Sequence, residues 1–236
     1  MKGSLDISAY LVIGPENTNG RAVADVVGQA IDAGFTCVQV RSKECSAREL
    51  IDCTVAVADV IARRGMGEQV ALLVDDRVDV ALAARARGAK VDGVHVGQSD
   101  IPVDVCRELL GPDAIVGLSA RTAEMLEYVK TADMSVVDYL GVGPLHETAT
   151  KPDCGMDAQG NVITKDFDDL RQLAQASPVP IVVGGGVKLA DVPLVRSTGV
   201  AGFFVVSAVC GATNPYESAK SLVDAWRAED SREGNN

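Results

Sequence analysis

Cationic and acidic side chains recur where short apolar runs of this sequence end. Arg41 and Lys43 follow one run, Lys151 follows a later one, and Asp76 and Asp100 end two consecutive runs. In a chain with a formal net charge of -11, three cations on converging loops predict a site for a polyanion such as pyrophosphate. Two carboxylates can share one hard cation, and Mg²⁺ takes one or two carboxylates together with phosphate oxygens and waters. The pattern therefore predicts a magnesium and diphosphate site.

A second anion site is predicted from glycines near the C-terminal end of the chain. Gly184, Gly185 and Gly186 follow an apolar run, so that bare backbone N–H groups could approach a phosphate, and Ser207 follows the next run with a hydroxyl donor. A tight turn is the alternative interpretation of the glycines.

Simpler roles stay open for the other polar residues. Asp76 could cap a helix that begins near Arg77, and Asp100 could open a turn before Pro102. His95 and His146 have no Cys or His partner at metal-ligand spacing, which argues against zinc and favours structural or surface roles.

The elements that must position these residues alternate along the whole chain. Helical signals include an apolar stripe from Val23 to Ile31 with Gly34 as its stop, a capping box at Ser46 and Glu49, and an Asn214-Pro215 start for the last helix. Between them lie continuous apolar runs, typical of parallel strands buried on both faces. The expected strands are Tyr10–Ile13, Thr36–Val40, Val70–Val74, Gly93–Val96, Ala114–Leu118, Val137–Val142, Pro180–Val183 and Gly202–Val206.

Eight strand and helix units without a low-complexity linker favour an α/β fold of one domain, a (β/α)8 TIM barrel over residues 1–228. In such a barrel the loops after the strands meet at one mouth, which would gather the residues above. A doubly wound open sheet is the alternative. The polar segment 229–236 is expected to be a disordered tail.

Composition excludes several classes of partner. The negative charge and the absence of a Lys/Arg run argue against nucleic acid and membrane surfaces, and no signal-peptide core follows Met1. The six cysteines form no Cys-x-x-Cys pair, which predicts reduced thiols and a cytoplasmic protein. Small-molecule substrates remain as partners, and the sequence leaves open whether the chain forms a homo-oligomer.

Six ordered motifs extend over nearly the whole chain. They are Gln39-Val40-Arg41-Ser42-Lys43, Val74-Asp75-Asp76-Arg77, Gly93 to Asp100, Gly117-Leu118-Ser119, Gly141-Val142-Gly143-Pro144 with Thr148-Ala149-Thr150-Lys151, and Gly185-Gly186 with Val206-Ser207. Together they resemble the thiamine-phosphate synthase family. The resemblance implies a Mg²⁺-dependent transferase of thiamine biosynthesis. It would join an aminopyrimidine diphosphate to a thiazole phosphate and release pyrophosphate, by a dissociative displacement that needs little acid–base chemistry.

The resemblance also implies residue roles. Residues 39–43, Asp75, Ser119 and Lys151 would hold the pyrimidine diphosphate, with Arg41, Lys43, Lys151 and Ser119 as the catalytic set. Asp76 and Asp100 would bind Mg²⁺. The thiazole phosphate would contact Thr148, Ala149, Thr150, Gly186, Val206 and Ser207.

Three positions depart from the family pattern. Asp75 stands where the family usually has Asn, which adds a negative charge near the diphosphate. Gly184 stands where Ile is frequent, which predicts a more flexible loop. Residues 153–164 form a longer, more polar segment than expected, interpreted as a mobile lid.

Three other functions are alternatives to the synthase. A related thiazole tautomerase would need a His shortly after Ser119, where this chain has Ala120 and Arg121. A non-catalytic phosphate-binding barrel has no need of Asp76, Asp100 and the cations together. An isomerase or epimerase of phosphorylated sugars would need a catalytic acid–base pair at the strand ends, and the sequence offers no better pair.

Overall fold

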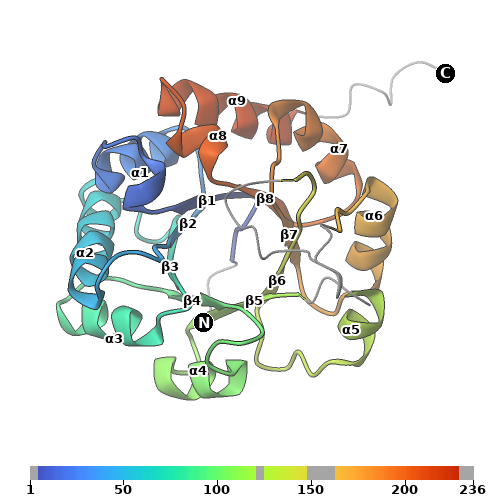
Figure 1. The fold of residues 1–236 in the computed structure, drawn as a ribbon, viewed down its shortest axis with the longest axis horizontal. Helices are drawn as coiled ribbons and strands as arrows, with labels where there is room; N and C mark the ends of the chain where they lie inside the picture. The colour runs from blue at the N-terminus through green and yellow to red at the C-terminus, as the bar shows by residue number, and fades with distance from the viewer. Residues whose placement is uncertain (1–4, 121–124, 148–162, 229–236) are drawn as a thin grey trace.

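A computed structural model describes residues 5–120, 125–147 and 163–228, and within them the strands form one closed parallel barrel in the order β1 to β8. The ring closes where Tyr10 of β1 pairs with Phe204 of β8 (Figure 1). The predicted barrel is therefore confirmed, and the open sheet is wrong. The strands are β1 Ala9–Ile13, β2 Cys37–Val40, β3 Ala71–Asp75, β4 Gly93–Val96, β5 Ile115–Ser119, β6 Tyr139–Val142, β7 Ile181–Val183 and β8 Gly202–Val205.

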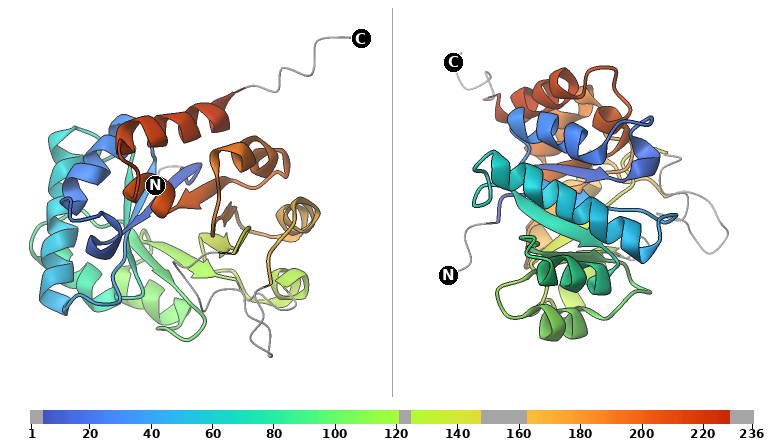
Figure 2. Two further views of the ribbon diagram at one scale, coloured as in Figure 1. Left: turned by 45° about the horizontal axis from the view of Figure 1, so that its top comes forward. Right: turned by 90° about the vertical axis from the view of Figure 1, so that its left-hand side faces the viewer.

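Helices cover the outside of the barrel, as the further views in Figure 2 show. They are α1 Val23–Asp32, α2 Ala47–Arg63, α3 Val78–Ala86, α4 Val103–Leu110, α5 Met125–Thr131, α6 Phe167–Ala176, α7 Val192–Ser197, α8 Ser207–Cys210 and α9 Pro215–Arg227, with short 3-10 turns η1 Pro15–Asn17 and η2 Leu189–Asp191. None of the helices in the described part of the chain is long and apolar enough to cross a membrane.

The predicted helix signals are present. Ser46 and Glu49 form a reciprocal capping box at the start of α2, and the Asn214 side chain accepts from the Glu217 N–H at the start of α9. Gly34 has a φ of 107°, a conformation that disfavours any residue with a β-carbon, and it follows the last turn of α1.

Two apolar layers hold the barrel together. Side chains alternate along each strand, so Leu11 and Ile13 of β1 pack between the sheet and the helices, whereas Tyr10 and Val12 point into the barrel. Because both faces of β1 are fully buried, its run of apolar residues has no polar alternation. The inner layer matters for function, since its upper residues form the floor of the mouth.

Candidate active site

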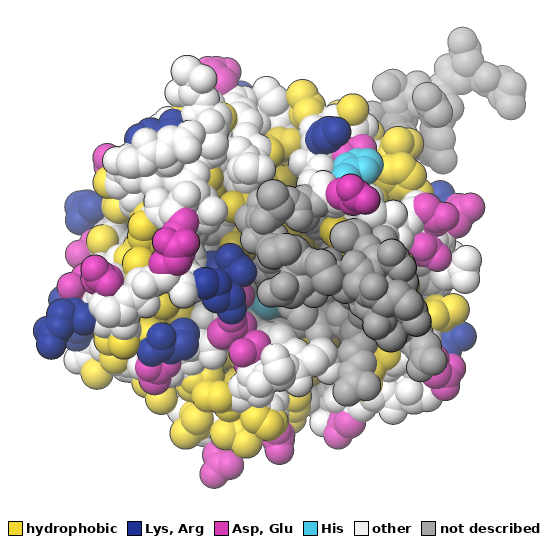
Figure 3. Space-filling view, in the orientation of Figure 1, with side chains coloured by type: hydrophobic (Ala, Val, Ile, Leu, Met, Phe, Trp, Pro, Cys, Tyr) yellow, Lys and Arg dark blue, Asp and Glu magenta, His cyan; other side chains and the backbone are white. Residues whose placement is uncertain are grey.

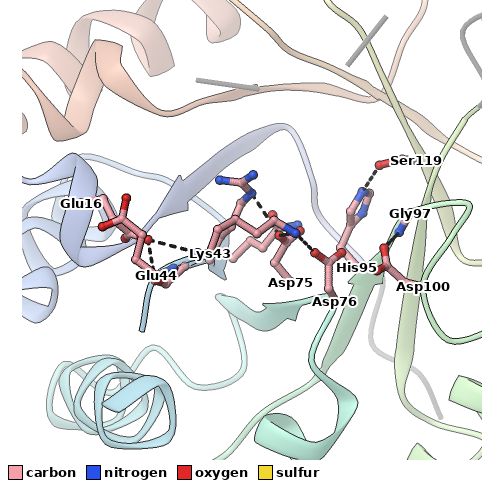
Figure 4. A network of polar contacts seen from close by, with 12 residues as sticks. Glu16, Lys43, Glu44, Asp75, Asp76, His95, Gly97, Asp100 and Ser119 are labelled. Carbon is pink, nitrogen blue, oxygen red and sulfur yellow. Dashed lines mark hydrogen bonds and ion pairs between the residues drawn. The ribbon is translucent and has the colours of Figure 1, made fainter. Parts of the chain in front are cut away.

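A cluster of cations and carboxylates lies at the ends of β2, β3 and β4 (Figure 4). Arg41 Nε is 3.0 Å from Asp75 Oδ2. Lys43 Nζ forms an ion pair with Asp76 and lies 3.9 Å from Asp75 Oδ2. The carboxyl groups of Asp76 and Asp100 lie within hydrogen-bond reach of one another. The structure thus brings these five side chains to one rim, and Figure 3 shows Lys and Arg side chains beside Asp and Glu near the centre of this face.

Local backbone geometry aims Asp76 into this cluster. Its φ is 58°, the left-handed region that Asp tolerates better than most residues, and its N–H donates to the His95 carbonyl at 2.8 Å. Helix α3 begins after Arg77, with no side-chain cap bond. The helix-cap interpretation of Asp76 is therefore wrong, because the reversed backbone carries its carboxylate toward Lys43 and Asp100.

Asp100 is held by its own loop. Its Oδ2 accepts from the Gly97 N–H at 2.7 Å, so Asp100 closes a turn that begins at Gly97, whereas the sequence predicted that it would open the next one. Burial, followed by the hydrogen bond and negative charge of Asp76, raises the pKa of the Asp100 carboxyl. Although partial burial opposes it, the hydrogen bond and charge of Asp76 raise the pKa of Lys43. The cluster thus favours a cation between the two carboxylates.

Glu16, for which the sequence carries no motif signal, organises the loop after β2. Its Oε1 accepts from the Lys43 N–H at 3.1 Å and from the Ser42 hydroxyl. The Ser42 Oγ in turn accepts from the Cys45 N–H at 2.9 Å. Ser42 therefore contributes to the shape of the loop, and Glu16 fixes where Lys43 leaves the barrel wall.

A pocket beside the cluster occupies the mouth of the barrel. Its lining includes Arg41, Ser119, Gly186, Val206 and Ser207, together with apolar side chains of the inner layer. Gly185 and Gly186 have φ values of 82° and 74°, and a β-carbon on Gly186 would lie 2.9 Å from His146 Cβ. The glycines are thus required by backbone conformation and close packing, in the place where barrels commonly bind phosphate.

Gly184 has a packing reason of its own. A β-carbon there would lie 2.1 Å from Cε2 of the Phe204 ring, which also lines the pocket. The absent side chain makes room for an aromatic wall of the pocket, and the backbone at Gly184 is not in the left-handed region.

Two predicted site residues, Gln39 and Ser119, lie within strands of the barrel. Gln39 lies within β2 and is 2% exposed, and Ser119 ends β5 with its Oγ 3.0 Å from His95 Nε2. Val40, by contrast, packs in the outer layer against the helices and does not line the pocket. Alternation along β2 therefore presents Gln39 and Arg41 to the mouth and turns the Val40 side chain away.

The chain is similar to one protein family along most of its length. The family model for thiamine monophosphate synthase matches residues 9–209. The chain belongs to that family. It is 40% identical to the thiamine-phosphate synthase of Corynebacterium efficiens over 96% of this chain and 98% of the relative, and 38% identical to that of Albidiferax ferrireducens over 92% and 91%.

One solved structure supports the same family. The thiamine phosphate pyrophosphorylase of Pyrococcus furiosus has 28% identity and a TM-score of 0.73, with 93% of this chain and 95% of that chain covered. A 3-hexulose-6-phosphate synthase, at 17% identity and a TM-score of 0.59, shares the fold alone. The fold is therefore common to several activities, whereas the sequence motifs narrow the family to the thiamine monophosphate synthases.

Some predicted residues lie outside the described part of the chain. These are Thr148, Ala149, Thr150 and Lys151, most of the segment 153–164 interpreted as a lid, and the tail 229–236. Next to that segment, His146 Nε2 lies 2.9 Å from Asp191 Oδ2, and Asp191 Oδ2 also accepts from the Lys188 N–H at 2.8 Å. His146 thus ties the loop after β6 to η2, in agreement with a structural role.

Tyr10 and Tyr139 were also missed as site residues. Both are buried in the inner layer, and Tyr10 lines the pocket floor. In the sequence each is one aromatic residue in an apolar strand. Only the alternation of side chains along β1, which turns Tyr10 inward together with Val12, could have indicated the position of Tyr10.

Proposed function

We propose that this chain is a thiamine-phosphate synthase. It condenses 4-amino-2-methyl-5-(diphosphooxymethyl)pyrimidine with a thiazole phosphate and releases pyrophosphate. The observation that carries the proposal is one rim on which Arg41 pairs with Asp75 and Lys43 pairs with Asp76, beside Asp100 and a pocket walled by the glycines after β7. The names of the chain's relatives support the same reaction.

The reaction breaks the bond between the exocyclic methylene of the pyrimidine and the diphosphate oxygen, and the thiazole nitrogen then forms the new bond to that carbon. Negative charge grows on the departing pyrophosphate. Arg41, with a side chain only 15% exposed, is placed to stabilise this charge where water is partly excluded, and Lys43 adds a second cation at the exposed edge of the rim. Lys151 is proposed as the third cation.

The thiazole phosphate is proposed to bind at the other side of the pocket. The backbone at Gly186 and Val206 and the Ser207 hydroxyl line it there, at the start of α8. A phosphate anchored at that position would hold the thiazole nitrogen near the methylene carbon, and the apolar wall would keep out water, whose attack is the competing reaction.

The residues present fit Mg²⁺ as the metal. Asp76 and Asp100 supply hard carboxylate oxygens within hydrogen-bond reach of one another, and two such groups without a cation or proton between them would repel. Among the described residues, no cluster of three or more His, Cys, Asp or Glu forms a closed metal cage. An ion that shares its coordination with substrate phosphates and waters, as Mg²⁺ does, suits this pair. When bound, it would neutralise charge on the diphosphate.

A pyrophosphate-release assay tests the proposal directly. Pyrophosphate should appear only when both substrates and Mg²⁺ are present, and the Lys151→Ala variant should lose at least about tenfold in turnover because the leaving group loses a cation. Well-folded protein that releases none would favour a phosphate-binding barrel. Near-normal turnover by Lys151→Ala would remove Lys151 from the site.

Asp75 gives a separate prediction, because its carboxylate competes with the diphosphate for Arg41. The Asp75→Asn variant should lower the KM for the pyrimidine diphosphate by about three- to tenfold, since the Arg41 charge becomes available, and should lose about 1–3 kcal/mol of stability with the buried ion pair. Steady-state kinetics and denaturant unfolding measure the two effects. Asp79→Asn is the matched control, since that carboxylate pairs with Arg77 away from the pocket. An unchanged or higher KM in Asp75→Asn would contradict the competition.

The cellular setting is also a proposal. The described cysteines Cys37, Cys45, Cys53, Cys106 and Cys210 are all free thiols, which suits a reducing cytoplasm.

A further inference from the structure

A chain of hydrogen bonds crosses the interior of the barrel beneath the pocket. It begins on β2, where Gln39 Nε2 lies 2.6 Å from the Tyr10 hydroxyl, and the Tyr10 and Tyr139 hydroxyls are 2.8 Å apart. Tyr139 then contacts His95 Nδ1 at 2.9 Å, and His95 Nε2 lies 3.0 Å from Ser119 Oγ. This chain of hydrogen bonds links two predicted substrate-binding residues, Gln39 and Ser119, through the side chains of Tyr10, Tyr139 and His95.

The surrounding strands leave room for this chain. A β-carbon on Gly117 would lie 2.2 Å from Cζ of Tyr139, and one on Gly141 would lie 2.9 Å from Cε1 of His95. Gly117 of β5 is the register partner of both His95 on β4 and Tyr139 on β6. The glycines on β5 and β6 therefore allow two rings to lie over the sheet, where β-carbons would exclude them.

The two tyrosine hydroxyls keep their protons. Burial, followed by the charge of nearby groups, raises the pKa of both Tyr10 and Tyr139 well above the ordinary value. Each hydroxyl therefore has one proton to donate and can accept from its neighbour.

The Gln39 amide sets the direction of donation. Its nitrogen donates to Tyr10, so Tyr10 must give its single proton to Tyr139, and Tyr139 must give its own to His95 Nδ1. A nitrogen that accepts carries no proton, which places the ring proton of neutral His95 on Nε2, where it is donated to Ser119 Oγ. Ser119 then keeps its own hydroxyl proton for the pocket.

At its Gln39 end, the chain of hydrogen bonds presents an acceptor to the pocket, not a donor. Gln39 Oε1 is buried and has no hydrogen-bond partner among the described residues, while Gln39 lines the pocket. A buried amide oxygen without a partner costs stability, which a ligand N–H can recover. The pocket thus offers an acceptor at Gln39 and a donor at Ser119.

We propose that Tyr10, Tyr139 and His95 form a positioning relay that fixes this polarity, with His95 neutral and protonated on Nε2. The ligand that matches is a nitrogen heterocycle with an amino N–H and a ring-nitrogen acceptor on one edge. The identification of that heterocycle as the aminopyrimidine rests on the proposed function, but the relay itself does not.

The tautomer of His95 can be measured without substrate. The chain contains two histidines, so ¹⁵N-histidine labelling gives two ring spin systems, and a His146→Gln variant assigns the remaining one to His95. Its Nε2 should carry the proton and its Nδ1 should resonate as an unprotonated nitrogen that accepts a hydrogen bond. A ring proton on Nδ1 would overturn the relay, because the donors would then run from Ser119 toward Gln39.

The Tyr139→Phe variant breaks the relay with little change in volume. The Nδ1 signal of His95 should shift, and kcat/KM for the pyrimidine diphosphate should fall about tenfold, as expected for one lost hydrogen bond, while the KM for the thiazole phosphate stays within about twofold. Tyr216→Phe on α9, outside the barrel interior, is the matched control and should change neither. Equal losses toward both substrates, or no shift of the His95 signal, would overturn the positioning role.

Conservative replacement of His95 separates positioning from packing. The oxygen and nitrogen of a glutamine amide are separated by one atom, as the two ring nitrogens of histidine are, so His95→Gln can accept from Tyr139 and donate to Ser119. His95→Gln should retain about tenfold more kcat/KM than His95→Leu when both melt within a few degrees of the wild type. Equal activity of the two folded variants would contradict the relay. If the protein released no pyrophosphate at all, the proposed function would fail, and the tautomer and the Tyr139→Phe shift would still decide the relay.

Discussion

Replacement of Arg41 by methionine is expected to lower kcat/KM by about a thousandfold. The variant removes a largely buried cation whose Nε lies 3.0 Å from Asp75 and whose side chain lines the pocket, and preorganised donors in such sites contribute about 10²–10³ each. It also leaves the Asp75 carboxylate, 4% exposed, without its closest cation, which is expected to cost about 3–5 kcal/mol of stability. Single-turnover kinetics and urea unfolding measure the two losses.

A double variant separates the two effects. Arg41→Met combined with Asp75→Asn removes the stranded charge, so it should recover most of the stability and none of the activity. Arg77→Met is the control, because Arg77 pairs with Asp79 and does not line the pocket. If Arg41→Met stayed within tenfold of the wild type, or if the double variant regained activity along with stability, the placement of Arg41 on the leaving group would be wrong.

Removal of the metal is expected to have an effect of similar size. Chelation should lower turnover by about a thousandfold, and Mg²⁺ should restore it, because the carboxylate-bound ion would neutralise charge on the diphosphate. Asp100→Asn removes one anionic ligand and should raise the Mg²⁺ concentration for half-maximal activity by at least about tenfold.

Thermal unfolding gives a readout that does not depend on turnover. Mg²⁺ at about a hundred times its Kd should stabilise the wild type by about 2.7 kcal/mol, and the Asp76→Asn/Asp100→Asn variant should show no such shift. Asp104→Asn, an exposed acidic residue in the first turn of α4, is the control for general charge. A double variant stabilised as much as the wild type would remove this pair from the metal site.

The sequence predicted the barrel well because its strands are buried on both faces. For seven of the eight predicted strands, both ends lie within one residue of the ends of the observed strand. The exception is the strand predicted to begin at Val137, since β6 begins at Tyr139. Asp138, just before β6, is a polar anchor whose carboxylate pairs with Arg107 and accepts from the Val116 N–H. Continuous hydrophobicity indicates where a strand passes through the core, and it marks the ends less sharply.

The types of residue that form the site could be predicted from the sequence, whereas their geometry could be predicted only in part. Side chains after the strands converge because the barrel brings parallel strand ends to one rim, and the sequence order was enough to place Asp76 near Asp100. It was not enough to show that Asp76 has a left-handed backbone, that Val40 faces the helices, or that Tyr10 and Tyr139 are in contact. Those facts depend on strand parity and on pairs of residues distant in sequence, which one chain does not reveal.

The contact between Gly184 and Phe204 has an evolutionary consequence. The ring occupies the volume that a side chain at Gly184 would need, so Gly184 is not free to gain a side chain while the ring stays in place. A homologue with isoleucine at the position of Gly184 must have acquired a smaller residue at the position of Phe204, either earlier or at the same time. Across the family these two sites should therefore covary, one large and the other small.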